Sequence, residues 1–134
     1  MRFCLDTNTC IDAMKGTWPE MAERFRQHVP EDIGVSAIVR AELLLGAMKS
    51  RNPGRTSELV EAFLAPFELL PFDRAAAGHY ADVRHQLETI GKSIGPNDLV
   101  IAATARSRNL TLVTHNRREF TRVPGLATED WATG

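Results

Sequence analysis

The first ten residues, Met1–Cys10, read MRFCLDTNTC and place a carboxylate directly after a short apolar run. The run Arg2–Leu5 is typical of a buried strand, and a helix is expected to begin near Thr7 or Asn8. In an open α/β sheet, ligands bind outside the carboxyl ends of the strands. Asp6 therefore has two interpretations here: an N-cap for the helix, or a carboxylate that reaches a substrate or a metal.

Short apolar runs and longer helical patterns alternate along the rest of the chain. The further expected strands are Ile33–Val35, Glu68–Leu70 and Thr111–Val113, with a last extended piece around Leu126–Ala127. The expected helices are Met21–His28, Ala37–Met48, Thr56–Leu64, Arg74–Ile90 and Asn97–Arg108. Other expectations are N-caps at Ser36 and Asp73, a helix end at Asn109, and packing of Trp131 against the body. The alternation predicts an α/β fold whose parallel sheet is covered by helices on both faces.

The composition favours a single globular domain and argues against several other classes of protein. The 134 residues, 43% of them hydrophobic, suffice for one globular domain over residues 1–134. A formal net charge of −1 argues against long charged arms and against nucleic-acid binding driven by bulk positive charge. Cys4 and Cys10 are too few for a disulfide framework, and Cys4 is expected to be a buried, reduced thiol of a cytoplasmic protein. Neither a signal-peptide core nor a membrane-spanning stretch is expected.

Two further carboxylates stand at unusual places. Glu42 lies on the nearly all-apolar helix and shares one face with Ile38 and Leu45 by i, i+4, i+7 spacing. A buried carboxylate is costly unless it is paired or bound to a metal. Glu42 therefore pairs with Arg40 or a neighbouring helix, lies on a solvent-facing stripe, or serves a site. Asp98 lies in the first turn of a helix, where it favours the helix dipole but also reaches the rim of the core.

A fourth group of polar residues follows the strand Thr111–Val113. Thr114, Asn116 and Glu119 are candidate oxygen ligands or hydrogen-bond donors, whereas His115 is expected to be a loop residue because hard cations prefer oxygen. Phe120 is expected to anchor the core. If the carboxylates converge, an oxygen-only cluster of this kind points to Mg²⁺ or Mn²⁺.

Five segments occur in a characteristic order. They are LDTN (Leu5–Asn8), SAIVRAELLLG (Ser36–Gly46), IGPND (Ile94–Asp98) with Ile101–Ala103, LVT (Leu112–Thr114) with Asn116, Glu119 and Phe120, and VPGL (Val123–Leu126) with Glu129–Trp131. Each is weak alone, but the ordered set spans nearly the whole chain. In this it resembles the PIN-domain ribonucleases, and among them the VapC toxins of type II toxin–antitoxin (VapBC) pairs.

The resemblance implies a PIN-like three-layer fold with a central, mostly parallel, twisted sheet flanked by helices. It also implies that Asp6, Glu42 and Asp98 are the catalytic acids that bind Mg²⁺ or Mn²⁺, with Thr7, Asn8 and Thr114 as supporting groups. RNA would be cleaved endonucleolytically to 5′-phosphate and 3′-hydroxyl ends. Many PIN domains carry a fourth acid where this chain has Asn116, so a two-metal mechanism is not expected unless Glu119 compensates.

The resemblance also implies partners. The RNA is expected to be tRNA, with the anticodon loop of the initiator tRNA as one candidate, and its cleavage would inhibit translation. Arg84, Arg117 and Arg118 are candidate RNA-binding residues, because local basic residues could contact phosphates. A VapB-type antitoxin would insert an Arg or Lys near the metal, and a homodimer would join it in a larger hetero-oligomer. The alternative is a non-catalytic PIN-like module that only binds RNA or protein.

Overall fold

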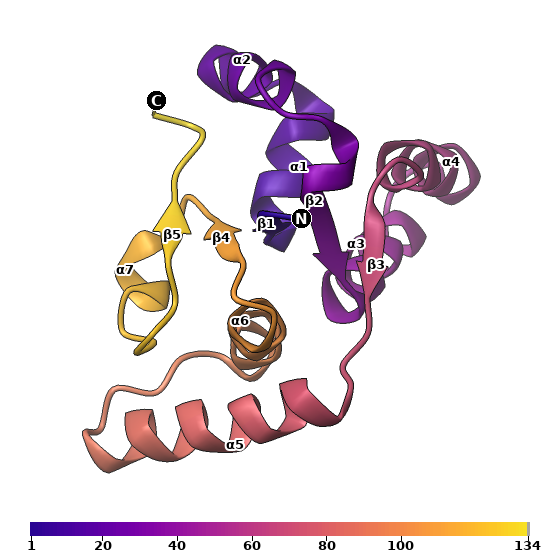
Figure 1. The fold of residues 1–134 in the computed structure, drawn as a ribbon. Coiled ribbons are helices and arrows are strands. Elements are labelled where there is room, and N and C mark those ends of the chain that lie inside the picture. Colours follow the sequence, from indigo (N-terminus) through magenta and orange to yellow (C-terminus); the bar gives the residue numbers. More distant parts are fainter. Residues whose placement is uncertain (134) are drawn as a thin grey trace.

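A computed structural model, which describes residues 1–133, shows a sheet of five parallel strands (Figure 1). The strands are β1 (Phe3–Leu5), β2 (Ile33–Ser36), β3 (Glu68–Leu70), β4 (Thr111–Val113) and β5 (Thr128–Glu129), arranged in the order β3-β2-β1-β4-β5. The predicted α/β class is confirmed, and every strand pair is parallel.

Helices cover both faces of this sheet. They are α1 (Thr7–Lys15), α2 (Pro19–Arg26), α3 (Ala37–Met48), α4 (Pro53–Leu64), α5 (Arg74–Thr89), α6 (Pro96–Ser107) and α7 (Arg117–Phe120), with one 3₁₀ turn at Pro30–Asp32. Figure 1 shows α6 between the sheet and α5, and α1 on the opposite face. No helix among residues 1–133 is long and apolar enough to cross a membrane.

The strand order places a crevice beside β1. From β1 the chain adds β2 and then β3 on one side, and later adds β4 and β5 on the other side. A reversal of this kind leaves a gap between the crossover helices at the carboxyl ends of the strands, which is the usual ligand position in open α/β sheets. The residues that directly follow β1 and β4 are therefore the ones placed to meet a ligand.

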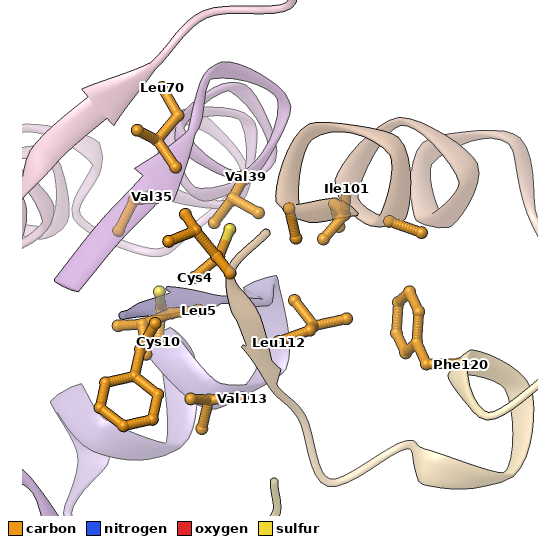
Figure 2. Close-up of a cluster of buried hydrophobic side chains, with 14 of the residues drawn as sticks. Cys4, Leu5, Cys10, Val35, Val39, Leu70, Ile101, Leu112, Val113 and Phe120 are labelled. Carbon is orange, nitrogen blue, oxygen red and sulfur yellow. The ribbon is translucent and has the colours of Figure 1, made fainter. Parts of the chain in front are cut away.

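Successive side chains of the central strands point to opposite faces of the sheet, so the core lies on both faces. Figure 2 shows Cys4 and Leu112 on the side of α3 and α6, and Leu5 together with Cys10 of α1 on the opposite side. These side chains are buried, as is Phe120, which confirms its expected anchoring role. Trp131 is also fully buried, so the last turn is held against the body of the domain.

Several predicted boundaries differ from the structure. The last strand is Thr128–Glu129 rather than Leu126–Ala127, because Leu126 still belongs to the turn at Gly125, with φ of 77°, and the first bond to β4 is accepted by the Ala127 carbonyl. Ser36 occupies the N-cap position of α3, but its hydroxyl makes no capping hydrogen bond, so that prediction was wrong in its chemistry. Asp73 does cap α5 by accepting from the backbone N–H of Ala76, as predicted.

Both cysteines are free and buried, and burial raises the pKa of the Cys4 thiol to about 12. Because the thiolate is the reactive form, we expect neither cysteine to react with a thiol-specific disulfide reagent in the native protein at pH 8. Unfolding in denaturant should expose two reactive thiols per chain. Rapid native labelling of either thiol, followed by absorbance, would contradict this packing.

Candidate functional site

Asp6 lies at the carboxyl end of the central strand, where three strands end together. The register pairs Leu5 with Val35 on one side and with Val113 on the other, so Asp6 lies level with Ser36 and Thr114. The residue is only 4% exposed. The Oδ1 atom accepts a hydrogen bond of 2.8 Å from the Thr9 backbone N–H. Asp6 is thus the N-cap of α1, and the same carboxylate also borders the cavity described next.

An acidic cavity of about 120 Å³ opens at this end of the sheet. Its lining consists of Asp6, Thr7, Asn8, Glu42, Asp98, Asn116 and Phe120. Residues from both ends of the chain therefore meet here, and the three carboxylates singled out from the sequence are all among them. We refer to this feature below as the acidic cavity.

Glu42 is held in the acidic cavity by neutral donors. The Thr7 hydroxyl donates to Oε1 at 2.7 Å, and the Asn97 side-chain amide donates to Oε2 at 3.3 Å. Arg40, the cation considered as its partner, instead pairs with Glu61 of α4. The ion-pair explanation of Glu42 through Arg40 is therefore wrong, and its charge stays available to the cavity.

The ionised form of Asp98 is disfavoured in the cavity. Its partial burial, a hydrogen bond shared with Glu119 and the nearby charges of Glu119, Glu42 and Asp6 together raise the pKa of its carboxyl to about 6. Glu119 thus lies beside the cavity at Asp98, although it does not line the cavity itself. Raised pKa values of this kind mark carboxylates crowded together without a compensating cation.

The ionised form of Asp6 is also disfavoured, but here burial and hydrogen bonds act in opposite directions. Burial raises its pKa, whereas hydrogen bonds from Thr114 and Thr9 lower it. The Thr114 hydroxyl, fully buried, in turn accepts from the backbone N–H of Asn116 at 2.9 Å. This chain of contacts joins the exit of β4 to the exit of β1 and fixes Asn116 at the wall of the cavity.

The donor set fits a hard divalent cation. None of the ion pairs among residues 1–133 involves Asp6, Glu42, Asp98 or Glu119, so their negative charge is not neutralised by the chain. The lining supplies carboxylate, amide and hydroxyl oxygens, which suit Mg²⁺ or Mn²⁺. Within the described residues, no three acidic, His or Cys side chains are already close enough to hold an ion together. Mg²⁺ commonly keeps several waters and takes only one or two carboxylates, so this spacing is compatible with it.

The candidate RNA-binding arginines fall in two places. Arg117 and Arg118 are exposed on α7, which begins directly after Asn116. Arg84 lies on α5, which packs on α6, and its guanidinium donates to Tyr80 and Glu88 of its own helix. Two of the three arginines therefore lie exposed on the helix that follows Asn116, and the third is hydrogen-bonded within its own helix.

Two contacts of the cavity were not foreseen. Asn97 orients Glu42, and Thr9 holds Asp6 while its hydroxyl donates to the Val113 carbonyl at 3.1 Å. The position of Thr9, three residues after an N-cap candidate, was the available signal, since the N-cap accepts from that backbone N–H. For Asn97 the sequence carried no signal beyond its place next to Asp98.

Comparisons with known proteins identify the family to which the chain belongs. The PIN domain family model matches residues 3–126. The tRNA(fMet)-specific endonuclease VapC of Shigella flexneri is 42% identical over 132 residues, covering 98% of this chain and 99% of the relative. Ribonuclease VapC2 of Haemophilus influenzae is 41% identical over 131 residues, covering 98% of each chain.

Solved structures give the same result. The DNA-bound VapBC complex of Salmonella typhimurium contains a chain that superposes with a TM-score of 0.93 at 42% identity, with 98% of each chain covered. VapBC2 of Rickettsia felis, bound to a promoter DNA fragment, gives 0.89 at 34% identity, covering 98% of this chain and 99% of that one. PIN-domain nucleases generally depend on a divalent metal, which agrees with the unneutralised carboxylates found here. The chain belongs to the PIN-domain family and, within it, to the VapC ribonucleases.

Proposed function

We propose that the protein is a Mg²⁺- or Mn²⁺-dependent endoribonuclease that acts as the toxin of a VapBC pair in the cytoplasm. The single observation that carries the proposal is the acidic cavity, in which Asp6, Glu42 and Asp98 meet without a cationic partner among the described residues. A module that only bound RNA would be weakened by this uncompensated negative charge, because phosphates are repelled by it. The non-catalytic alternative is therefore not favoured.

The chemistry follows from where each oxygen lies. Asp6 and Asp98 would hold the cation, with Glu42 or Asn116 completing the set. A bound divalent cation supplies positive charge to the scissile phosphate and makes a bound water more acidic. Asp98 or Glu42 would orient and deprotonate the attacking water. In-line attack would form a bond to phosphorus and break the bond to the 3′ oxygen, leaving 5′-phosphate and 3′-hydroxyl ends.

Thr7, Asn8 and Thr114 would act through the carboxylates or at the rim. Thr7 donates to Glu42 and Thr114 contacts Asp6, so both hold an acid in place. Asn8 lines the cavity, and its exposed side chain would meet the substrate or a water. Arg117 and Arg118 would contact phosphates of the RNA that leaves the cavity along α7.

Glu119 would compensate in part for Asn116. Because the Glu119 carboxylate lies beside Asp98 and raises its pKa, replacement of Glu119 changes the charge beside one metal ligand without removing that ligand. We expect Glu119→Gln to weaken Mn²⁺ binding by about tenfold, the lower end for a supporting partner of a metal ligand. Titration calorimetry measures this, with Glu31→Gln, a change at an exposed acid, as the matched control. Unchanged affinity would remove Glu119 from the site.

The RNA and protein partners are proposed from the relatives. The Shigella relative is named a tRNA(fMet)-specific endonuclease, and we propose initiator tRNA as the substrate here as well.

An apolar cavity of about 440 Å³ lies between α1, α3 and α4, and Glu42 lines both this cavity and the acidic one. We propose that a VapB-type antitoxin lays an apolar segment here and extends an Arg or Lys toward Glu42. A homodimer, joined with antitoxin into a larger assembly, is proposed from the family.

Expression without the antitoxin tests the function as a whole. Induction of the intact protein should arrest growth by stopping translation, and sequencing of RNA 5′ ends should show new phosphorylated ends within one tRNA. Asp6→Asn should be harmless, because Asn still caps α1 but no longer supplies a charged ligand. Glu31→Gln should remain as toxic as the parent protein. Harmless expression of the intact, folded protein would defeat the proposal.

A further inference from the structure

Two aromatic side chains meet on the surface, and one of them is next in sequence to Asn116, which lines the acidic cavity. The ring centroids of Trp18 and His115 lie 5.2 Å apart, with the rings tilted by 44°. The His115 side chain is 44% exposed, and Trp18 is partly exposed. We infer that Trp18 and His115 form a stacking platform for an RNA base beside the scissile phosphate, an inference that rests on the proposed ribonuclease function.

Both rings of the platform are connected to residues that line the acidic cavity. His115 lies between Thr114, which contacts Asp6, and Asn116, which lines the cavity. On the other side, the Trp18 indole N–H donates to Asp12 at 3.1 Å. Asp12 lies on α1 four residues after Asn8, another lining residue, so the two share one face of the helix one turn apart. Each ring is therefore separated from a residue of the cavity by one position in sequence or one helical turn, and we place the base of a neighbouring nucleotide on the rings with its phosphate in the cavity.

The imidazole of His115 is oriented before any ligand arrives. Its Nδ1 atom lies 2.9 Å from Oδ2 of Asp130, and a carboxylate can only accept, so the hydrogen is on Nδ1. Asp130 is itself fixed, because its other oxygen accepts from the Ala132 backbone N–H at 2.9 Å and the Thr133 hydroxyl donates to Oδ2. The Nε2 atom of His115 has no hydrogen-bond partner among the described residues, which leaves it free to accept from a polar group of the RNA that lies in the plane of the ring.

The charges around the rings favour a base over a phosphate. Asp12 and Asp130 lie against the two rings, and a phosphate placed there would be repelled. A base carries no such charge, and aromatic stacking accepts any of the four bases. Arg117 and Arg118, exposed on α7 directly after Asn116, supply positive charge for the RNA backbone.

Substitutions at Trp18 separate stacking from packing, because Trp18 also contacts the core. Phe and Leu both remove the indole N–H bond to Asp12, and both keep an apolar side chain, but only Phe keeps an aromatic face. We expect Trp18→Leu to raise the KM for cleavage of a single-stranded RNA by about fivefold to a hundredfold, with kcat little changed. Trp18→Phe should recover most of this loss. His115→Ala should raise KM in the same way.

The controls distinguish failure of the stacking platform from failure of the proposed nuclease function. Phe72→Leu, at an exposed aromatic residue that follows β3 on the opposite edge of the sheet, should leave KM unchanged. Equal KM values for Trp18→Phe, Trp18→Leu and the parent protein would overturn the platform while the parent's cleavage still supported the nuclease. A parent protein that cleaves no RNA would overturn the proposed function and the platform with it. Weakened antitoxin binding with unchanged KM would assign these rings to the protein partner, and would also overturn the inference.

Discussion

Replacement of Asp98 by Asn is expected to abolish RNA cleavage and, at the same time, to stabilise the metal-free protein. The loss of activity follows because a neutral amide supplies less charge to a cation and cannot take a proton from water. We expect a decrease in cleavage rate of about a hundredfold or more, in line with removal of a single group from a preorganised charged site.

The stabilisation follows from the raised pKa of Asp98, which is about 6 in the folded protein. A folded-state pKa above the unfolded value means that the folded state binds the proton more tightly, so ionisation of Asp98 opposes folding. That cost is absent below the unfolded pKa of about 4 and complete above about pH 6. Since Asp98 is partly exposed, solvent screening reduces it to about 1 kcal/mol, or about 3 °C in Tm at pH 7.

Thermal unfolding in the presence of a chelator at pH 4 and pH 7 tests whether Asp98→Asn stabilises the folded protein. The Asp98→Asn substitution should raise Tm at pH 7 and have a much smaller effect at pH 4, where Asp98 is largely protonated in the folded protein. Glu31→Gln, at an exposed acid outside the cavity, should have no comparable pH-dependent effect. An Asp98→Asn protein that is less stable than the parent at pH 7 would show that the carboxylates are not in electrostatic conflict.

Replacement of Trp131 by Ala is expected to cost the folded state about 3–5 kcal/mol, a large part of the stability of an ordinary domain. Trp131 is fully buried, and its ring packs edge-on against Phe3 and Phe25 at centroid distances of 5.1 and 5.0 Å. The ring also stacks on His28 at 5.2 Å. Its removal leaves a cavity that these rings fill only in part.

A polar contact adds to this cost. The Trp131 indole N–H donates to Oε1 of Glu129 at 3.1 Å, and the same oxygen pairs with Arg24 of α2 at 2.7 Å. Trp131 therefore helps to hold the last strand against α2, through Phe25 and the Glu129–Arg24 pair, as well as filling the core. Urea denaturation measures the loss. Trp131→Phe should lose much less than Trp131→Ala, and Phe72→Ala, at an exposed ring, should lose about 0.5 kcal/mol or less. Equal losses at Trp131 and Phe72 would contradict the packing.

The elements with strong local signals could be predicted from the sequence. Ala37–Met48 has the same bounds in the structure, because its run of Ala, Leu and Met begins directly after Ser36 and outweighs the single Gly46 near its end. Glu68–Leu70 and Thr111–Val113 also match. The last strand did not, since two residues carry almost no periodicity and their pairing is decided by β4.

The acidic cavity was predictable in its members but not in its contacts. Asp6, Glu42 and Asp98 stood out because carboxylates at strand ends and on apolar helices are costly without a purpose. Their meeting depends on the order and register of the strands, which no local pattern records. The same holds for the pairing of Arg40 with Glu61, since it depends on how α3 and α4 pack.

Cleavage of purified initiator tRNA by chelator-treated protein, as a function of added Mg²⁺ or Mn²⁺, tests the acidic cavity most directly. We predict no cleavage without the cation, a rate that saturates as the cation is added, and fragments with 5′-phosphate ends. The Asp6→Asn protein, confirmed as folded by circular dichroism, should stay inactive at every cation concentration. Cleavage at the parent rate in excess chelator, or by folded Asp6→Asn, would contradict the metal-dependent site.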